Sequence, residues 1–342
     1  MIEFGIRLPP CGPPAETARA AHEAEGAGFA SGWVMDSQLL GGVLGDTYMH
    51  LVACAAATRT LRLGPAVTNP FTRHATVTAA AMLTLDDAAP GRAILGIGTG
   101  GSSLRTFGAS VVRIGGSWGA GRQAVRETAG LLRDLCDGKA VALDGAPLRL
   151  SGPRPRIPVY VSATGERALE LAGEIADGVI VQVSLHPAPL RWAIERVHRG
   201  AARAGRDPAS IRLVCSTFTS IDDDPRRAVE LSKPLAAWFY SKAPRFVEMA
   251  GFEVTQREPA VHVPPDLYHP LDHAAAVRAA SFVPDAAARA LCLTGTPEEC
   301  VERLKSLDDL GIHQYFLRDV ETFRLPWQLI RLCGDRLIPR LR

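Results

Sequence analysis

Residues 64–74 combine small residues with amide and hydroxyl side chains, directly after an apolar run. A backbone without bulky side chains allows a flat ring to lie against it. The residues that such a ligand would contact are Ala66, Val67, Thr68 and Asn69. An ordinary turn from a strand to a helix, capped by Thr72, is the alternative, and this segment alone slightly favours it.

Glycines at positions 96, 98 and 101 follow another apolar run and formally match the spacing of a dinucleotide-binding loop. That loop normally opens a helix directly and is followed, about twenty positions on, by an acidic residue at the end of a strand. Neither condition is met here, so we expect no site of that kind. The closely spaced glycines instead predict that a ring or ribityl chain approaches Gly98, Thr99 and Gly100.

A possible phosphate site follows the apolar run that ends near residue 161. Its residues are Ser162, Ala163, Thr164, Gly165 and Glu166, after which a helix is expected to begin. Free backbone amides and the dipole at a helix start favour an anion, and two hydroxyl groups add donors. A Ser/Thr cap without a ligand explains the same residues equally well. The next run brings Gln182 to the same edge of the sheet.

Four side chains near expected strand ends are candidates for catalysis: Arg7, Asp36, Ser37 and His74. Arg7 could pair with an anionic substrate or stabilise developing negative charge, and a surface arginine is the alternative. Asp36 and Ser37 could relay a proton. Asp36 could also hold the cofactor, or simply cap a helix. For His74 a structural hydrogen bond is the simpler interpretation. The nine histidines show no metal-binding spacing, so no metal site is expected.

The elements that must position these residues alternate regularly. Runs rich in Ile, Val and Leu predict strands near 2–8, 31–36, 61–68, 92–98, 157–162, 178–183, 211–219 and 313–318. Segments of helical periodicity lie near 14–28, 46–58, 75–89, 119–137, 165–176, 187–204, 224–239, 297–310 and 320–334. Eight strand–helix units predict an α/β fold, a (β/α)8 TIM barrel, whose active site lies at the carboxyl ends of the strands. A doubly wound open sheet shares this alternation.

Two stretches interrupt the alternation. Residues 138–156 are rich in Gly and Pro and predict a hairpin or loop, and residues 240–296 contain repeated prolines among aromatic residues. Long insertions in barrels usually sit on loops and carry function, so we expect the second to form a lid over the substrate. Residues 1–342 are thus expected to form a single barrel domain with two insertions.

Composition narrows the possible partners. The 38 Lys and Arg residues nearly balance the 36 Asp and Glu residues, and no basic block is present, so nucleic acid is an unexpected partner. Seven cysteines without a CxxC pair favour a reducing cytoplasm. Neither a signal peptide nor a run of about eighteen apolar residues is found, so a membrane is also unexpected.

Six segments in order along nearly the whole chain resemble the luciferase-like monooxygenase superfamily. Within it the resemblance is to the deazaflavin (F420)-dependent oxidoreductase branch, and the sequence is similar to methylenetetrahydromethanopterin reductases. The segments are residues 4–6, 33–36, 64–74, 91–98, 172–179 and 293–299. The resemblance implies a cis peptide bond between Ala66 and Val67 against one face of the ring. It also implies that 98–100 lie near the ring or its side chain, that 162–166 surround the phosphate, and that the protein is a homodimer.

Two positions depart from these relatives. Arg7 stands where methylenetetrahydromethanopterin reductases carry Glu, and Ser37 stands where many relatives carry His. We therefore expect a divergent enzyme that acts on a different small molecule.

The resemblance implies hydride transfer between C5 of F420 and an unidentified small organic substrate. An FMN-dependent monooxygenase on the same barrel is the first alternative, because fold alone does not separate the two chemistries. A flavin-binding protein without catalytic turnover is the second, because both usual catalytic side chains are replaced.

Overall fold

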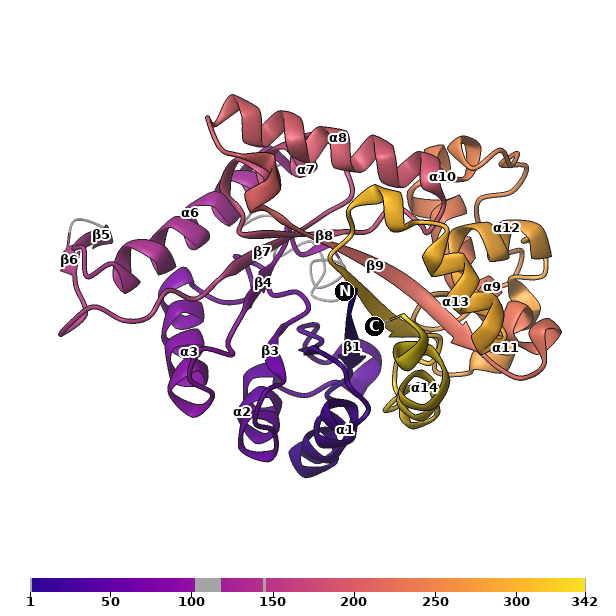
Figure 1. Cartoon of the computed structure of the whole chain (residues 1–342), viewed down its shortest axis with the longest axis horizontal. Coiled ribbons are helices and arrows are strands. Elements are labelled where there is room, and N and C mark those ends of the chain that lie inside the picture. Colours follow the sequence, from indigo (N-terminus) through magenta and orange to yellow (C-terminus); the bar gives the residue numbers. More distant parts are fainter. Residues whose placement is uncertain (1, 102–117, 144–145, 342) are drawn as a thin grey trace.

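The computed structural model describes residues 2–101, 118–143 and 146–341. Its centre is a ring of eight parallel strands (Figure 1). They are β1 (Glu3–Leu8), β2 (Ser31–Val34), β3 (Arg62–Pro65), β4 (Leu95–Ile97), β7 (Val159–Ala163), β8 (Gly178–Val181), β9 (Arg212–Ile221) and β11 (Gln314–Asp319). Neighbours follow the order β3, β2, β1, β11, β9, β8, β7, β4. Parallel bridges from Leu63 to Ala93 and from Thr68 to Ile97 join β3 to β4 and close the ring. This closure confirms the predicted (β/α)8 barrel and excludes the open sheet.

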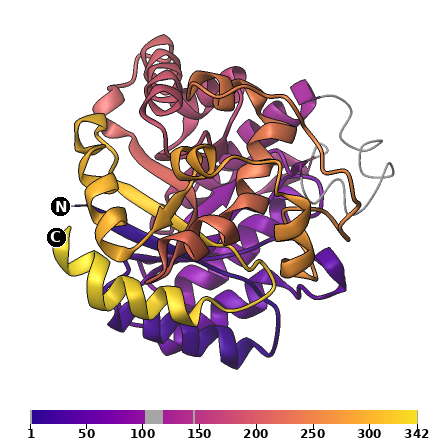
Figure 2. The ribbon, with the colours of Figure 1, turned by 90° about the vertical axis from the view of Figure 1, so that its right-hand side faces the viewer.

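Helices cover the outside of the ring (Figure 1 and Figure 2). The longer ones are α1 (Pro14–Gly26), α2 (Thr47–Ala57), α3 (Ala75–Ala88), α6 (Trp118–Cys136), α7 (Glu166–Ile175), α8 (Pro187–Arg203), α9 (Pro225–Lys242) and α13 (Pro297–Lys305). The shorter ones are η1 (Leu40–Gly42), η2 (Pro208–Ser210), α10 (Pro244–Met249), α11 (His273–Ala279), α12 (Asp285–Leu291), η3 (Asp308–Leu310), α14 (Trp327–Leu332), η4 (Cys333–Leu337) and η5 (Ile338–Arg340). In the part of the chain with described coordinates, no helix has the length and hydropathy needed to cross a membrane.

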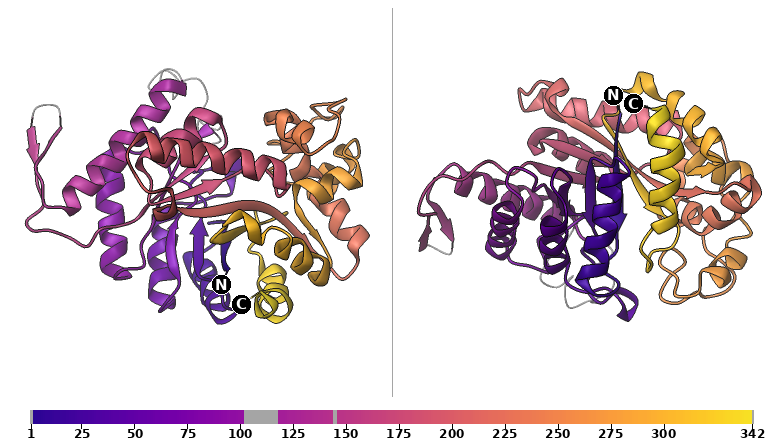
Figure 3. Two further views of the ribbon diagram at one scale, coloured as in Figure 1. Left: turned by 45° about the horizontal axis from the view of Figure 1, so that its top comes forward. Right: turned by 60° about the horizontal axis from the view of Figure 1, so that its bottom comes forward.

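Two segments lie outside the regular alternation. The antiparallel hairpin of β5 (Val141–Leu143) and β6 (Ala146–Leu148) extends away from the barrel (Figure 3), as the prediction for 138–156 allowed, although residues 144 and 145 lie outside the described residues. Residues 240–296 form more than the expected loop. They contain α10, α11 and α12 and end in the strand β10 (Leu293–Gly295), which pairs with β9.

The last helix was predicted to begin too early. A helix near 320–334 was expected, but α14 begins only at Trp327. Pro326 precedes this first helical residue and cannot donate a backbone hydrogen bond, so it marks the helix start. Residues 320–326 instead form a loop beside the carboxyl end of β11.

An inner cluster of side chains fills the barrel below its carboxyl end. Its buried members are Trp33, Ile94, Tyr160, Ile180, Val214 and Phe316, and Ala66 and Val67 pack against them. Trp33 touches the rings of Tyr160 and Phe316, with centroids 6.0 and 5.8 Å away. This cluster forms the floor of any site above it.

Glycine allows β3 and β4 to meet beside Trp33. A Cβ atom on Gly64 would lie 2.1 Å from the carbonyl oxygen of Ile94, and one on Gly96 would lie 2.1 Å from that of Pro65. Both distances are far below van der Waals contact, so the ring can close only with glycine at these positions.

Glu25, at the end of α1, binds the backbone that leads into β3. Burial alone raises the pKa of its carboxyl group, but hydrogen bonds from the N–H groups of Thr60, Leu61 and Arg59 and from the Thr60 hydroxyl outweigh this and lower the pKa to about 2. A lowered folded-state pKa stabilises the protein above the usual value of about 4.3, and this contribution is lost as the pH falls toward the folded-state pKa.

Glu25→Gln is therefore expected to lower the free energy of unfolding at pH 7, by about 1 kcal/mol after allowance for partial exposure. The difference from the wild type should shrink as the pH is lowered from 5 to 3, measured by urea unfolding. Glu23→Gln, on the exposed side of the same helix, is the control. A loss of stability that is equal at pH 7 and pH 3 would contradict the role of the charge.

Candidate functional site

A cavity of about 870 Å³ opens at the carboxyl ends of the barrel strands. Predicted site residues that line it are Arg7, Ser37, Ala66, Val67, Gly98, Thr99, Gly100, Ser162, Ala163, Thr164, Gly165, Glu166 and Gln182. They come from β1, β2, β3, β4, β7 and β8 or from the residues directly after these strands. Most of the site residues predicted from strand ends in the sequence therefore do line the cavity.

The wall at β3 is a bulge formed by Ala66 and Val67. The peptide bond between them is cis, as the resemblance implied. Gly98 lies opposite, where an added Cβ atom would be 3.0 Å from Cγ2 of Val67. Gly100 has a φ of +74°, and an added Cβ atom would be 2.7 Å from that of Asn69. Gly98 therefore keeps the cavity open beside Val67, and Gly100 allows the chain to pass close to Asn69.

Asp36, Thr68 and Asn69 were expected in the site but do not line the cavity. They are buried behind the bulge. Asp36 accepts a hydrogen bond from Gln38, and burial raises the pKa of its carboxyl group although the Thr68 hydroxyl and Arg73 oppose the shift. The Asn69 side chain accepts hydrogen bonds from the backbone N–H groups at positions 71 and 72. Asn69 thus orders the turn that follows the bulge.

His74 also lies outside the cavity lining. It is the N-cap of α3, where its Nδ1 atom accepts a hydrogen bond from the backbone N–H of Thr76. The N-cap is therefore His74 and not Thr72, whose hydroxyl accepts a hydrogen bond from Asn69. The structural interpretation of His74 fits this position, and we do not retain it as a catalytic candidate.

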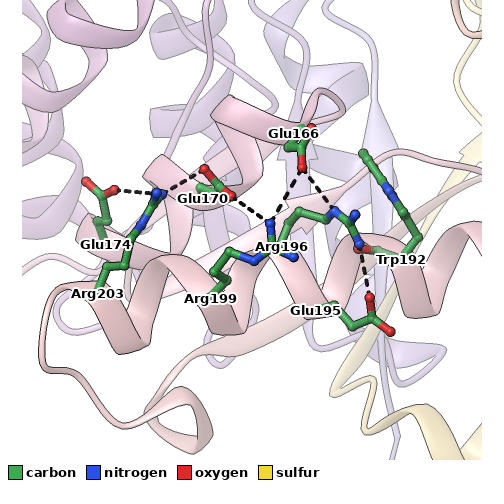
Figure 4. Close-up of polar contacts among 8 residues, drawn as sticks. All are labelled: Glu166, Glu170, Glu174, Trp192, Glu195, Arg196, Arg199 and Arg203. Atoms are coloured by element: carbon green, nitrogen blue, oxygen red, sulfur yellow. Dashed lines mark hydrogen bonds and ion pairs between the residues drawn. The ribbon is translucent and has the colours of Figure 1, made fainter.

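One end of the cavity is cationic and lies at the start of α7. Arg122 of α6 and Arg167 of α7 line it and form no ion pair with described residues. Arg245 of α10 also lines it, donates to the carbonyl oxygen of Thr164 at 2.8 Å and stacks on the Trp192 ring. Glu166 faces the opposite way, toward Arg196 and Arg199 of α8 (Figure 4). Its carboxylate therefore leaves the helix start available to an anion.

A second cationic end of the cavity lies at β1 and β11. Only one of its two arginines was predicted from the sequence. Arg7 was predicted, whereas Arg318 at the end of β11 was overlooked although it occupies the same kind of strand-end position. His269, from the insertion, lines the same end, and its Nδ1 atom lies 3.0 Å from Oδ1 of Asp266. The insertion thus contributes to the cavity as expected of a lid, through its residues Lys242, Ala243, Pro244, Arg245, Tyr268 and His269.

Burial shifts the proton equilibria at this second end. Burial lowers the pKa of Arg318 to about 9, assisted by the positive charge of Arg7. Burial lowers that of Arg7 to about 10, against the attraction of Asp319. Burial lowers the pKa of His269 as well, against its hydrogen bond to Asp266. At neutral pH the two arginines are charged and His269 is neutral. Among residues with described positions, no cluster of His, Cys, Asp and Glu is suited to a metal ion.

Three comparisons with known proteins agree with this geometry. A sequence model described as luciferase-like monooxygenase matches residues 2–314. The 5,10-methylenetetrahydromethanopterin reductase of Methanolobus tindarius is 32% identical over 326 residues, covering 92% of this chain and 93% of the relative. The F420-dependent glucose-6-phosphate dehydrogenase of Nakamurella multipartita is 28% identical over 349 residues, covering 96% and 93%. The structure of the coenzyme F420-dependent tetrahydromethanopterin reductase from Methanopyrus kandleri superposes with a TM-score of 0.79 at 25% identity, covering 100% and 99%.

A closed parallel barrel with a large cavity at its carboxyl end defines the class of (β/α)8 barrel enzymes. Because the sequence model covers more than half of its length, the chain belongs to the luciferase-like monooxygenase family.

Proposed function

We propose that this protein is an F420-dependent oxidoreductase that acts on a small organic molecule. The observation that carries the proposal is the cavity itself, in which glycine-lined space after β4 lies between a cis Ala66-Val67 bulge after β3 and a cationic helix start after β7. Its relatives with F420 in their names match over nearly the whole chain, which favours F420 over FMN as the cofactor.

The residues present fit such a cofactor. Gly98 leaves space beside Val67 that a side chain would fill, and Gly100 has a positive φ that favours glycine. At the start of α7, the hydroxyls of Ser162 and Thr164 and the guanidinium groups of Arg122 and Arg167 would hold a phosphate. Gln182, after β8, adds an amide between these two regions.

The chain's own part in the reaction is to position and enclose the reactants. When bound, the deazaflavin supplies a ring carbon, C5, that accepts or donates a hydride. Ala66 and Val67 would hold one face of the ring and would leave the other face to the substrate. Ser37 lines the cavity, and its Oγ atom is the hydroxyl that we assign to proton exchange with the substrate. Asp36 precedes Ser37 in the chain and is buried beside it, outside the cavity lining.

The experiment that tests this function is an equilibrium titration of the purified protein with F420 and, separately, with FMN, each oxidised and reduced, followed by fluorescence. Selective binding of F420 is expected. Selective binding of reduced FMN would instead support an oxygen-dependent monooxygenase, and binding of neither would overturn the cofactor assignment.

We also propose that the protein is a cytoplasmic homodimer. All seven cysteines are free, which is usual in a reducing compartment. Exposed apolar side chains occur on α2 and beside the η1 turn that precedes it, including Met49, which is 69% exposed, and Leu39, which is 67% exposed. Such a surface is suited to contact with a second copy of the chain.

Met49→Glu is expected to shift the protein from dimer to monomer in sedimentation velocity, because it places two like charges near each other across a symmetric contact. Glu23→Gln on α1 should leave the sedimentation coefficient unchanged. A wild-type protein that sediments as a monomer would contradict the dimer.

A further inference from the structure

Arg7 and Arg318 form an arginine pair on adjacent strands. In the parallel pairing of β1 with β11, Ile6 lies opposite Leu317, so the next residues of the two strands are Arg7 and Arg318. Side chains alternate along a strand, and Phe316, two residues before Arg318, points into the inner cluster. Both guanidinium groups therefore extend into the cavity, which both line.

Several hydrogen-bond donors of this arginine pair have no partner in the described chain. Nη2 of Arg7 donates to the carbonyl oxygen of Asp319, whereas Nε and Nη1 are buried without a hydrogen-bond partner among the described residues. Arg7 is only 3% exposed. The guanidinium carbon of Arg318 lies 4.4 Å from the centre of the Phe218 ring, and no hydrogen bond or ion pair joins Arg318 to the described chain.

The nearby carboxylates do not neutralise the cavity side of the pair. Asp319 follows Arg318 directly, so its side chain points to the other face of the strand, and it does not line the cavity. Burial raises the pKa of Asp319 to about 6 against the attraction of Arg7, and the backbone N–H groups of Val320 and Glu321 also bind the carboxylate. The carboxylate of Asp266 is hydrogen-bonded to Nδ1 of His269. The surface that a ligand meets therefore carries two positive charges and a neutral imidazole.

Arg7 is buried and Arg318 is half-buried, and the carboxylate of Asp319 lies on the other face of the strand, so these adjacent cations are unfavourable on the cavity side unless a partner supplies negative charge there. The walls around them are largely apolar and aromatic, with Phe218, Trp238, Phe316 and Met35 lining the same cavity. The complementary ligand is thus an organic anion, since guanidinium groups match the geometry of carboxylates and phosphates. This end is separate from the cationic end at α7 and lies on β1 and β11, across the ring from β4 and β7.

We propose that the substrate carries an anionic group, a carboxylate or a phosphate ester, and that Arg7 and Arg318 bind this group while its reactive carbon lies toward the Ala66-Val67 bulge. The inference rests on the proposed oxidoreductase function and adds the class of substrate.

The test is isothermal titration calorimetry of the protein saturated with oxidised F420, with benzoate, phenyl phosphate and the neutral benzyl alcohol as probes. Benzoate or phenyl phosphate should bind more tightly than benzyl alcohol, and the tighter of the two identifies the anion. Arg318→Gln is expected to weaken the binding of that anion by roughly 10- to 100-fold. The affinities for benzyl alcohol and F420 should be unchanged. Arg318→Lys should retain part of the affinity because it keeps the charge.

Arg324→Gln is the matched control, since this arginine lies on the loop after β11 with its side chain 79% exposed and outside the cavity lining. Equal affinity for benzyl alcohol and both anions, no saturable anion binding, or unchanged anion affinity in Arg318→Gln would each overturn the proposal. The same titrations on F420-free protein keep the two proposals distinguishable. If F420 does not bind, the oxidoreductase function fails, while selective anion binding that Arg318→Gln weakens still establishes the anion site.

Discussion

Gly200→Ala is expected to destabilise the protein by about 3 kcal/mol, at the upper end of what overpacking costs. An added Cβ atom at Gly200 of α8 would lie 1.9 Å from the carbonyl oxygen of Glu170 in α7. Gly173 of α7 meets α8 in the same way, 2.0 Å from the carbonyl oxygen of Val197. Both obstacles are backbone atoms, so the two helices would have to move apart. Urea unfolding measures the change.

Gly130→Ala is the matched control, because Gly130 lies within α6 and an added Cβ atom would meet nothing within 4 Å. There the substitution should stabilise the protein by roughly 0.5–1 kcal/mol, since alanine favours helix. A similar loss of stability at positions 130 and 200 would contradict an explanation based on helix contact.

Ion pairs between the same helices should matter much less. Arg199 and Arg203 of α8 reach Glu170, and Arg203 also reaches Glu174, at N–O distances of 2.7 to 3.5 Å (Figure 4). Both arginine side chains are more than half exposed, and exposed pairs contribute about 0–1 kcal/mol each. Close backbone approach, rather than charge, therefore decides how α7 sits on α8 and where its amino-terminal end faces the cavity.

The double variant Arg122→Gln/Arg167→Gln is expected to weaken F420 binding by roughly 10- to 100-fold, because it removes two cations from the end of the cavity assigned to the phosphate. A deazaflavin truncated after its ribityl chain should bind the variant and the wild type with nearly equal affinity. Fluorescence titration measures both ligands.

The control for charge alone is Arg191→Gln, since Arg191 is exposed on α8 and pairs with Asp309 outside the cavity. Higher salt should weaken F420 binding to the wild type more than to the double variant, since fewer charges remain to be screened. If the truncated deazaflavin loses as much affinity as F420, the two arginines do not act on the phosphate.

The barrel was predictable because its strands are buried on both faces and appear as continuous apolar runs. Helices α10, α11 and α12 were not, because each has only six or seven residues and prolines separate them from their neighbours. Tertiary packing, for example Phe246 against Trp192, stabilises them in place of local periodicity.

The sequence allowed us to predict that the site residues lie at strand ends. It did not allow us to predict which of these side chains face the cavity. Ser37 and Val67 line the cavity, whereas Asp36 and Thr68, which are adjacent to them in the chain, are buried outside its lining. A shift of one residue reverses the face, and sequence does not fix where a short strand stops. Arg318 could have been predicted as a site residue in the same way, since the strand near 313–318 was predicted and Arg318 is its last residue.

The junction of β3 with β4 makes the barrel unequal around its circumference. Its backbone hydrogen bonds form two groups, at Leu63 and Ile94 on one side of the bulge and at Thr68 and Gly98 on the other. Local opening in proteins begins where such bonding is interrupted. A molecule resting on the Ala66-Val67 bulge adds contacts to both sides of this junction, so occupancy and barrel rigidity are thermodynamically linked. A bound ligand would in this way complete the contacts between β3 and β4.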